Sequence, residues 1–168
     1  MMMFSEQFSQ QHSFEIMHNG KKINAFFRYD KKGIYRLRFD FLSTASPYRQ
    51  AVVLHLSEFH GRIFMDGKEI AIAKKKRFPQ IVFSEADSID APNYIEMTIE
   101  LQDGHIAICN GSEHPEIEGL WTTLYGGCAM IIEQLDTLHY RFYCNDREND
   151  DDFDDLIFEL SITPANEQ

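Results

Sequence analysis

The stretch Tyr35-Arg36-Leu37-Arg38-Phe39-Asp40-Phe41 decides the fold class. Apolar and charged residues alternate in it without a break, which is the pattern of a β-strand with one buried face and one face in water. The same alternation recurs in three later segments, Tyr94–Leu101, Leu138–Cys144 and Leu156–Ile162. We therefore expect all four segments to be strands that each bury one face.

The remaining chain also consists of strand-length segments between turn signals. Hairpin turns are expected at Asn19-Gly20, Asp66-Gly67 and Asp103-Gly104, because residues of these types tolerate positive φ. Residues 51–57 are mostly apolar, as expected of a central strand covered on both faces. The turn signals in residues 1–42 predict a three-stranded meander there. No segment shows a long helical repeat.

Roughly ten strands at short spacing predict an all-β fold, namely an antiparallel two-sheet β-sandwich or jelly roll. A closed β-barrel of lipocalin size is the alternative. The chain has 168 residues, of which 43% are apolar and 13% aromatic, which is enough for one core. We expect a single domain over residues 1–168. We expect both ends to be loosely held, namely residues 1–12, as a loose arm or an edge strand, and residues 163–168.

The net charge of −11 disfavours nucleic acid as a partner, because phosphate binding requires a basic field. A basic protein partner or a divalent cation is compatible with this charge. No segment approaches 18 consecutive apolar residues, so no membrane span is expected. The odd number of cysteines, Cys109, Cys128 and Cys144, indicates reduced thiols. Residues 1–13 show no signal peptide, so we expect a cytoplasmic protein.

Residues 145–155 form an acidic loop between two predicted strands. They hold seven carboxylates and one arginine, a net charge of −6. If the final strand continued backwards through this loop, Asp152 and Asp154 would face the core unpaired, which is too costly. We therefore expect an ordered turn near 154–155 that resets the phase, buries Phe153 and leaves the carboxylates fanned to one side.

Carboxylates and asparagine oxygens at alternate positions are the hard ligands that Ca²⁺ prefers. The loop positions expected to bind such an ion are Asp146, Glu148, Asp150, Asp152, Asp154 and Asp155. The loop is not an EF-hand, because neither frame has glycine at its sixth position or glutamate at its twelfth. Two alternatives stay open, a solvated loop and a surface for a basic protein partner.

The segment Asp150-Asp151-Asp152-Phe153-Asp154-Asp155-Leu156-Ile157-Phe158 resembles an ending found in bacterial β-sandwich domains of surface and secreted proteins. That ending has the form D-x-D-(F/Y)-N-D-(L/M)-(V/I)-(F/V), and its Asp-rich turn precedes the last core strand. The resemblance implies a final core strand after residue 155. It also implies calcium near Asp150, Asp152, Asp154 and Asp155.

Trp121 and Tyr125 are four residues apart and share a face if their segment is a strand. An exposed pair would suit stacking on a glycan, whereas a buried tryptophan is the alternative. No nucleophile elbow, zinc-ligand spacing or phosphate loop is present in the sequence. Chemistry of an enzyme is therefore not favoured.

These observations predict a non-enzymatic binding module for a protein or a glycan, with residues 146–155 as its interaction or cation site. Calcium is the only cofactor that the sequence suggests. The alternative is an acidic immunity or inhibitor-type protein that binds a basic enzyme, which its charge would suit.

Overall fold

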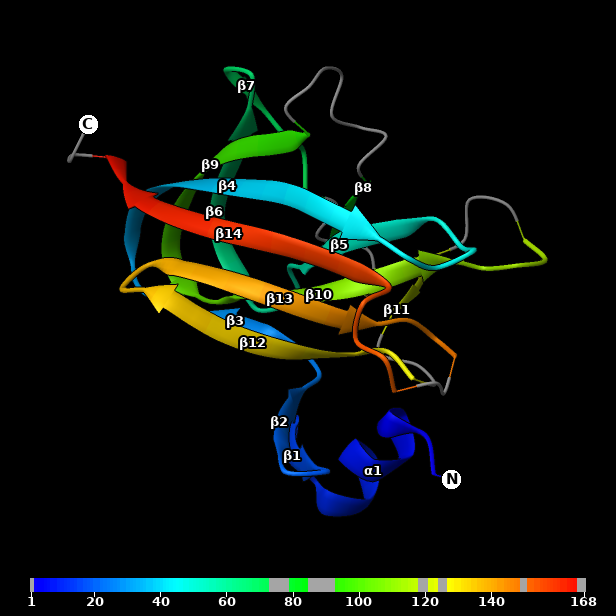
Figure 1. The fold of residues 1–168 in the computed structure, drawn as a ribbon. Coiled ribbons are helices and arrows are strands. Elements are labelled where there is room, and N and C mark those ends of the chain that lie inside the picture. Colours follow the sequence, from blue (N-terminus) through cyan, green and yellow to red (C-terminus); the bar gives the residue numbers. More distant parts are fainter. Residues whose placement is uncertain are drawn as a thin grey trace.

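The computed structural model describes residues 2–72, 79–84, 93–117, 121–123, 127–148 and 151–165. It is a two-sheet antiparallel β-sandwich with one short helix (Figure 1). The elements are α1 (Phe4–Gln11), β1 (Glu15–His18), β2 (Lys21–Asn24), β3 (Phe27–Tyr29), β4 (Gly33–Thr44), β5 (Gln50–His55), β6 (Phe59–Met65), β7 (Lys68–Glu69), β8 (Gln80–Ser84), β9 (Tyr94–Gly104), β10 (Ile106–Glu113), β11 (Trp121–Thr123), β12 (Ala129–Asp136), β13 (His139–Asn145) and β14 (Leu156–Pro164). The predicted all-β sandwich is confirmed, and within the described ranges neither sheet closes into a barrel.

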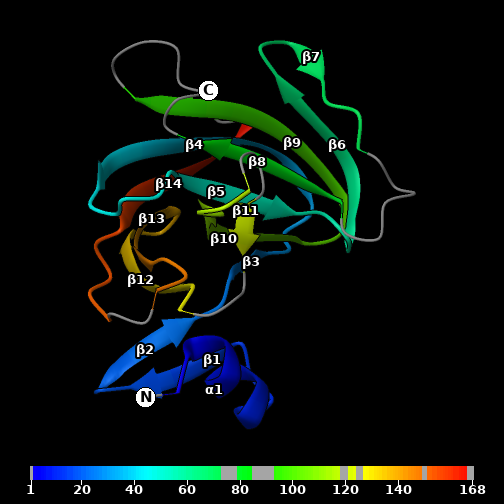
Figure 2. The same cartoon turned by 90° about the vertical axis from the view of Figure 1, so that its right-hand side faces the viewer.

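The larger sheet has nine strands in the order β1-β2-β12-β13-β14-β4-β9-β6-β7. It curls around the smaller sheet, whose order is β11-β10-β5-β8 with β3 also paired to β10 (Figure 2). The segment Tyr35–Phe41 lies in β4, which pairs with β14 on one side and with β9 on the other. The most regular alternation in the sequence therefore belongs to a strand with partners on both edges.

The core lies between the two sheets and is rich in aromatic rings. Phe39 of β4 contacts Phe83 of β8 with ring centroids 4.9 Å apart, and Phe142 of β13 stacks on Phe158 of β14 at 4.5 Å. The predicted inward residues of the last strand are buried, namely Leu156, Phe158, Leu160 and Ile162. Residues 51–54 of β5 are fully buried, which confirms a central strand covered on both faces.

The three-stranded meander predicted for residues 1–42 is wrong. β1 and β2 do form the hairpin expected at Asn19-Gly20, where both residues have positive φ. β3, however, pairs with β10, and the two neighbours of β4 come from distant parts of the chain. Turn signals are local, whereas pairing is decided by which apolar faces fit together.

The hairpin predicted at Asp103-Gly104 is also wrong, because β9 belongs to the larger sheet and β10 to the smaller one. Gly104 has φ +78°, and a Cβ there would lie 1.7 Å from the carbonyl oxygen of Glu58. Glycine is needed at this position for a close backbone approach where the chain crosses between sheets. The hairpin predicted at Asp66-Gly67 does join β6 to β7.

Residues 4–11 form helix α1, so the expectation of a loose arm or an edge strand is wrong for them. Phe4 and Phe8 are four residues apart, lie on one helix face and are both buried. They form a small second cluster with Ile16, Ile23, Ala25, Ala129 and Phe153. At the other end, β14 extends to Pro164, while residues 166–168 lie outside the described residues.

The three cysteines are unpaired and buried, as the sequence suggested. Burial raises the pKa of the Cys109 and Cys144 thiols, which keeps them in the unreactive thiol form. Among the described residues, no helix is long and apolar enough to cross a membrane.

Charged side chains form a ladder on the outer face of the larger sheet. Glu159 of β14 accepts hydrogen bonds from Arg141 at 2.9 and 3.0 Å, and its Oε1 lies 2.6 Å from His139 Nε2. Burial acts to raise the pKa of Glu159, but the bonds from Arg141 and His139 outweigh it and lower that pKa. Because the folded state prefers the ionised carboxylate, this ladder stabilises the fold above the pKa of the unfolded chain.

We expect Glu159→Gln to lower the melting temperature at pH 7. The deficit should shrink as the pH falls below about 4, where wild-type Glu159 also becomes protonated and loses its advantage. Thermal melts from pH 3 to pH 8 measure this. Glu133→Gln is the control, since Glu133 lies 4.0 Å from Arg141 and is half exposed. An equal deficit in both variants at every pH would contradict the assignment to Glu159.

Candidate functional site

The acidic loop starts from a buried amide. Asn145, at the end of β13, donates hydrogen bonds from Nδ2 to the carbonyl oxygens of Gly127 at 2.9 Å and Glu148 at 3.1 Å. The backbone carbonyl of Asn145 accepts a hydrogen bond of 2.7 Å from Asn110 Nδ2 on β10. A Cβ on Gly127 would lie 2.1 Å from the carbonyl oxygen of Glu148, so a side chain at 127 would clash with the loop. The start of the loop is therefore fixed to both sheets.

Among the described residues of the loop, two carboxyl groups are buried, Asp146 with 1% and Asp155 with 2% of its surface exposed. Asp146 accepts hydrogen bonds from Ser46 Oγ at 2.6 Å and from the backbone N–H of Glu148 at 2.8 Å. Asp155 Oδ2 accepts a 2.8 Å bond from the backbone N–H of Asp146 and so joins the two ends of the loop. The expectation that all carboxylates fan to one side is therefore wrong for these two residues, which close the turn.

Phe153 anchors the middle of the loop. Its side chain is buried, and its ring lies 5.5 Å from that of Phe4 in α1. Asp151 and Phe153 have φ angles of +61° and +53°, so the backbone departs from an extended strand just before β14 begins. These angles supply the change of phase that puts Phe153 and Leu156 in the interior. The ordered turn anchored by Phe153 is confirmed.

The first hairpin also holds the loop. Asn19 Nδ2 donates a 3.2 Å hydrogen bond to Asp151 Oδ2, and His18 Nε2 lies 3.1 Å from the same oxygen. The ring of Phe4 packs edge-on against His18 with centroids 4.9 Å apart. Residues separated by more than 100 positions therefore meet at the loop, and no local signal in the sequence marks this contact.

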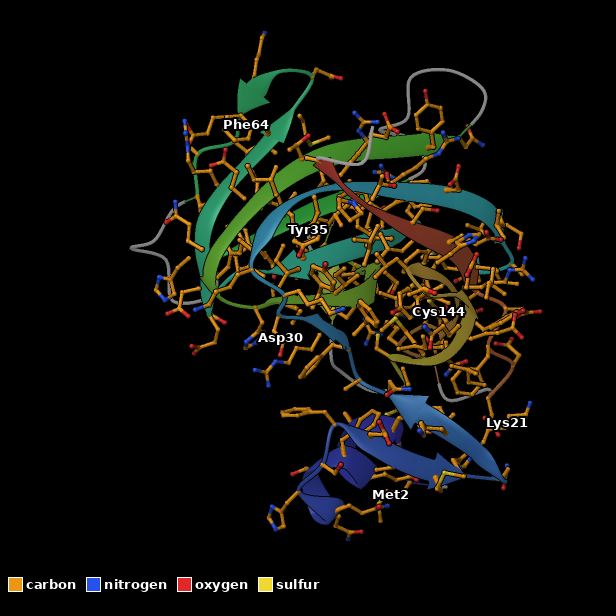
Figure 3. The ribbon with its side chains drawn as sticks, turned by 90° about the vertical axis from the view of Figure 1, so that its left-hand side faces the viewer. Met2, Lys21, Asp30, Tyr35, Phe64 and Cys144 are labelled. Carbon is orange, nitrogen blue, oxygen red and sulfur yellow. The ribbon has the colours of Figure 1, made fainter. Side chains whose placement is uncertain are left out.

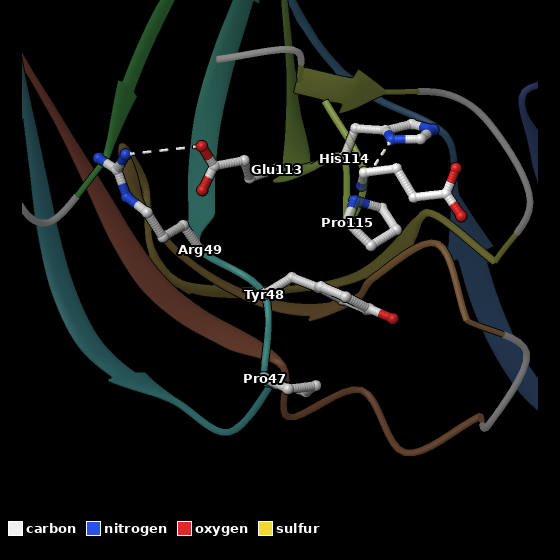
Figure 4. Close-up of a pocket in the computed structure, with 7 residues that line it drawn as sticks. Pro47, Tyr48, Arg49, Glu113, His114 and Pro115 are labelled. Carbon is white, nitrogen blue, oxygen red and sulfur yellow. Dashed lines mark hydrogen bonds and ion pairs between the residues drawn. The ribbon is translucent and has the colours of Figure 1, made fainter. Parts of the chain in front are cut away.

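An open pocket of about 620 Å³ lies beside the acidic loop (Figure 4). Its lining residues come from the segment before β5 and from the end of β10, and they are Pro47, Tyr48, Arg49, Glu113, His114, Pro115 and Glu116. The two segments meet because β5 and β10 are paired, and the backbone N–H of Glu113 donates to the carbonyl of Arg49 at 2.9 Å. Arg49 Nη1 lies 3.9 Å from Glu113 Oε1.

Tyr48 connects the pocket to the acidic loop. Its hydroxyl donates a 3.2 Å hydrogen bond to Glu148 Oε1. The charge of Glu148 and this hydrogen bond raise the pKa of Tyr48, so the phenol stays protonated and remains a donor at neutral pH. Tyr48 therefore links Glu148 to the pocket that Glu113 and Glu116 also line.

Three of the predicted cation ligands form a cluster in the structure. Carboxylate oxygens of Asp152, Asp154 and Asp155 all lie within 4.8 Å of one another. The pKa of Asp154 is raised by partial desolvation, by the nearby charge of Asp152 and by a hydrogen bond with Asp152. Three carboxylates are fewer than the six to eight oxygens that Ca²⁺ takes, so backbone or water oxygens would have to complete such a site. Calcium stays a prediction.

The other predicted ligands are placed differently. Asp146 and Glu148 are engaged by Ser46 and Tyr48, and Asp150 lies outside the described residues. The backbone of Trp121 belongs to β11, where it pairs with Glu113, but its side chain and Tyr125 also lie outside the described residues. The aromatic platform stays a prediction. The pocket residues Tyr48, Glu113 and Glu116 were not predicted, because only the pairing of β5 with β10 brings them together.

Asp155→Ala and Asp154→Ala separate the structural carboxylate from its exposed neighbour. Asp155→Ala should cost about 1–3 kcal/mol, because it leaves the buried N–H of Asp146 without its acceptor. Asp154→Ala should change stability by less than about 0.5 kcal/mol, since it removes an exposed like charge. Urea unfolding measures both. Equal losses would show that the loop is not closed through Asp155.

Comparison of the chain with protein-family models, with curated proteins and with solved structures found no match.

Proposed function

We propose that this chain is a non-enzymatic binding module that takes a basic segment of a protein partner at its acidic end. The observation that carries the proposal is an open pocket, beside the acidic loop, that Glu113 and Glu116 line. Asp146, Asp155 and Asn145 hold that loop in place through hydrogen bonds to the backbone. A preformed surface loses little entropy on binding.

The pocket suits a lysine or arginine side chain. Glu113 and Glu116 supply acceptors, and the ring of Tyr48 offers a face for a cation. Pro47 and Pro115 provide an apolar surface for the methylene stem of such a side chain. A ligand cation would share the Glu113 carboxylate with Arg49, whose Nη1 lies 3.9 Å from Glu113 Oε1.

A second candidate is the acidic immunity or inhibitor-type protein, and the net charge of −11 favours it. A basic enzyme would meet this surface through electrostatic steering, which raises the association rate. The two candidates share a basic partner. They differ in strength, because an inhibitor needs far tighter binding than a module that recognises short segments.

Fluorescein-labelled octalysine tests the proposal by fluorescence anisotropy. We expect saturable binding at 20 mM NaCl, with a Kd that rises at least about tenfold at 200 mM NaCl as the charges are screened. The double variant Glu113→Gln/Glu116→Gln should raise the Kd about fivefold or more at low salt. A peptide of eight glutamates should not bind.

The matched control is Glu133→Gln/Asp103→Asn, which removes the same charge from exposed residues outside the pocket. An equal loss in both double variants would mean that only net charge matters, and the pocket would not be the site. No binding of octalysine to the wild-type protein would also refute the proposal. If 5 mM CaCl₂, but not MgCl₂, raises the melting temperature and abolishes peptide binding, the acidic end is a calcium site instead.

A further inference from the structure

A second cavity lies where the first hairpin meets the sandwich, and it shares no residue with the acidic pocket. It is an open groove of about 560 Å³. Its apolar lining comes from Phe14, Phe26, Phe27 and Ile132, and its polar lining includes Asn24, Arg28 and His105. Figure 3 shows this junction between the hairpin, marked by Lys21, and the sandwich, marked by Asp30.

Phe14 is 61% exposed although its neighbours hold it in place. One side of the ring packs against Phe26, with centroids 4.7 Å apart. The carbonyl of Phe14 accepts a 2.8 Å bond from Ala25, and Ser13 Oγ bonds to the backbone of Glu15 on the other side. The exposed part of this ring is held in place by its neighbours, so it is preorganised for a ligand.

The floor of the groove is equally rigid. Phe27 packs against Tyr140 at 4.8 Å and against Phe142 at 5.6 Å, so it is anchored in the main core. A ligand that enters the groove therefore meets aromatic surfaces that are already in place.

The polar groups of the groove offer both donors and acceptors. Burial and the charge of Arg28 lower the pKa of His105, so its ring is neutral at pH 7 and has one donor and one acceptor nitrogen. The amide of Asn24 likewise has both kinds of atom, and Arg28 adds donors. The ion pair of Arg28 with Asp30 is long, at 3.9 Å, and both side chains are largely exposed.

We propose that this groove binds a neutral sugar ring of an oligosaccharide. A sugar has an apolar C–H face that can stack on Phe14 and a rim of hydroxyl groups that can both donate to and accept from Asn24, Arg28 and His105. A purely apolar ligand would bury these polar groups without partners. An anionic ligand would be repelled by the net charge of −11.

Saturation-transfer NMR with neutral hexasaccharides tests the inference, using cellohexaose, maltohexaose, mannohexaose, xylohexaose and hexa-N-acetylchitohexaose at millimolar concentration. We expect transfer to the ring C–H protons of at least one sugar. Phe14→Ala should weaken its binding about tenfold, the effect of losing one stacked aromatic ring. Met17→Ala is the control, because Met17 is 62% exposed, lies three residues away and does not line the groove.

Two further conditions separate this site from the acidic end. Sugar binding should be unchanged between 20 and 500 mM NaCl, and it should be unchanged in Glu113→Gln/Glu116→Gln. A failure of the sugar proposal can therefore be distinguished from a failure of the basic-peptide proposal. No transfer to any of the five sugars would overturn the inference, and so would equal binding by Phe14→Ala and wild type. Binding of an apolar tripeptide such as acetyl-Leu-Phe-Leu-amide in place of every sugar would assign the groove to a peptide and would also overturn it.

Discussion

The hydrogen bond from the backbone N–H of Asp146 to the carboxylate of Asp155 resolves the main conflict in this chain. The last strand must bury Leu156, Phe158 and Leu160, yet the residues just before it carry a net charge of −6. A chain that entered β14 without a turn would bring carboxylates into the core. By closing the loop on itself, Asp155 lets the acidic segment end sharply where the apolar strand begins.

The same closure links otherwise separate parts of the molecule. Asn145 joins the loop to both sheets, Phe153 joins it to α1, and Asp151 joins it to the first hairpin. Buried polar networks of this kind are stable when every main partner is present, and they are costly when one is removed. The acidic segment therefore acts as a framework at one end of the sandwich, and the carboxylates not used in it define the chemistry offered to a partner.

The sequence predicted those features that depend on a single strand and its two faces. The alternation in β4, β9, β13 and β14 gave their positions and inward residues, and the phase of Leu156 implied the turn around Phe153.

Features that depend on pairing were missed. Asp103-Gly104 has the composition of a hairpin, but the chain crosses between the sheets there, and Gly104 allows the close approach of the Glu58 backbone. Helix α1 was not predicted, because Phe4 and Phe8 are the two residues of this helix that are buried, and two positions do not make a helical repeat. The pocket beside Tyr48 requires the pairing of β5 with β10, which no local pattern reports.

The position of β14 has a consequence for the order of folding. This strand, residues 156–164, lies between β13 and β4 in the middle of the larger sheet. Until β14 pairs with β4, the strands on its two sides remain two separate parts of that sheet, and β4 has an open edge. Pairing between segments this distant is slow and leaves apolar edges open in the meantime. The folding chain therefore depends on β14 to close the larger sheet, and it is most exposed to aggregation before this strand pairs.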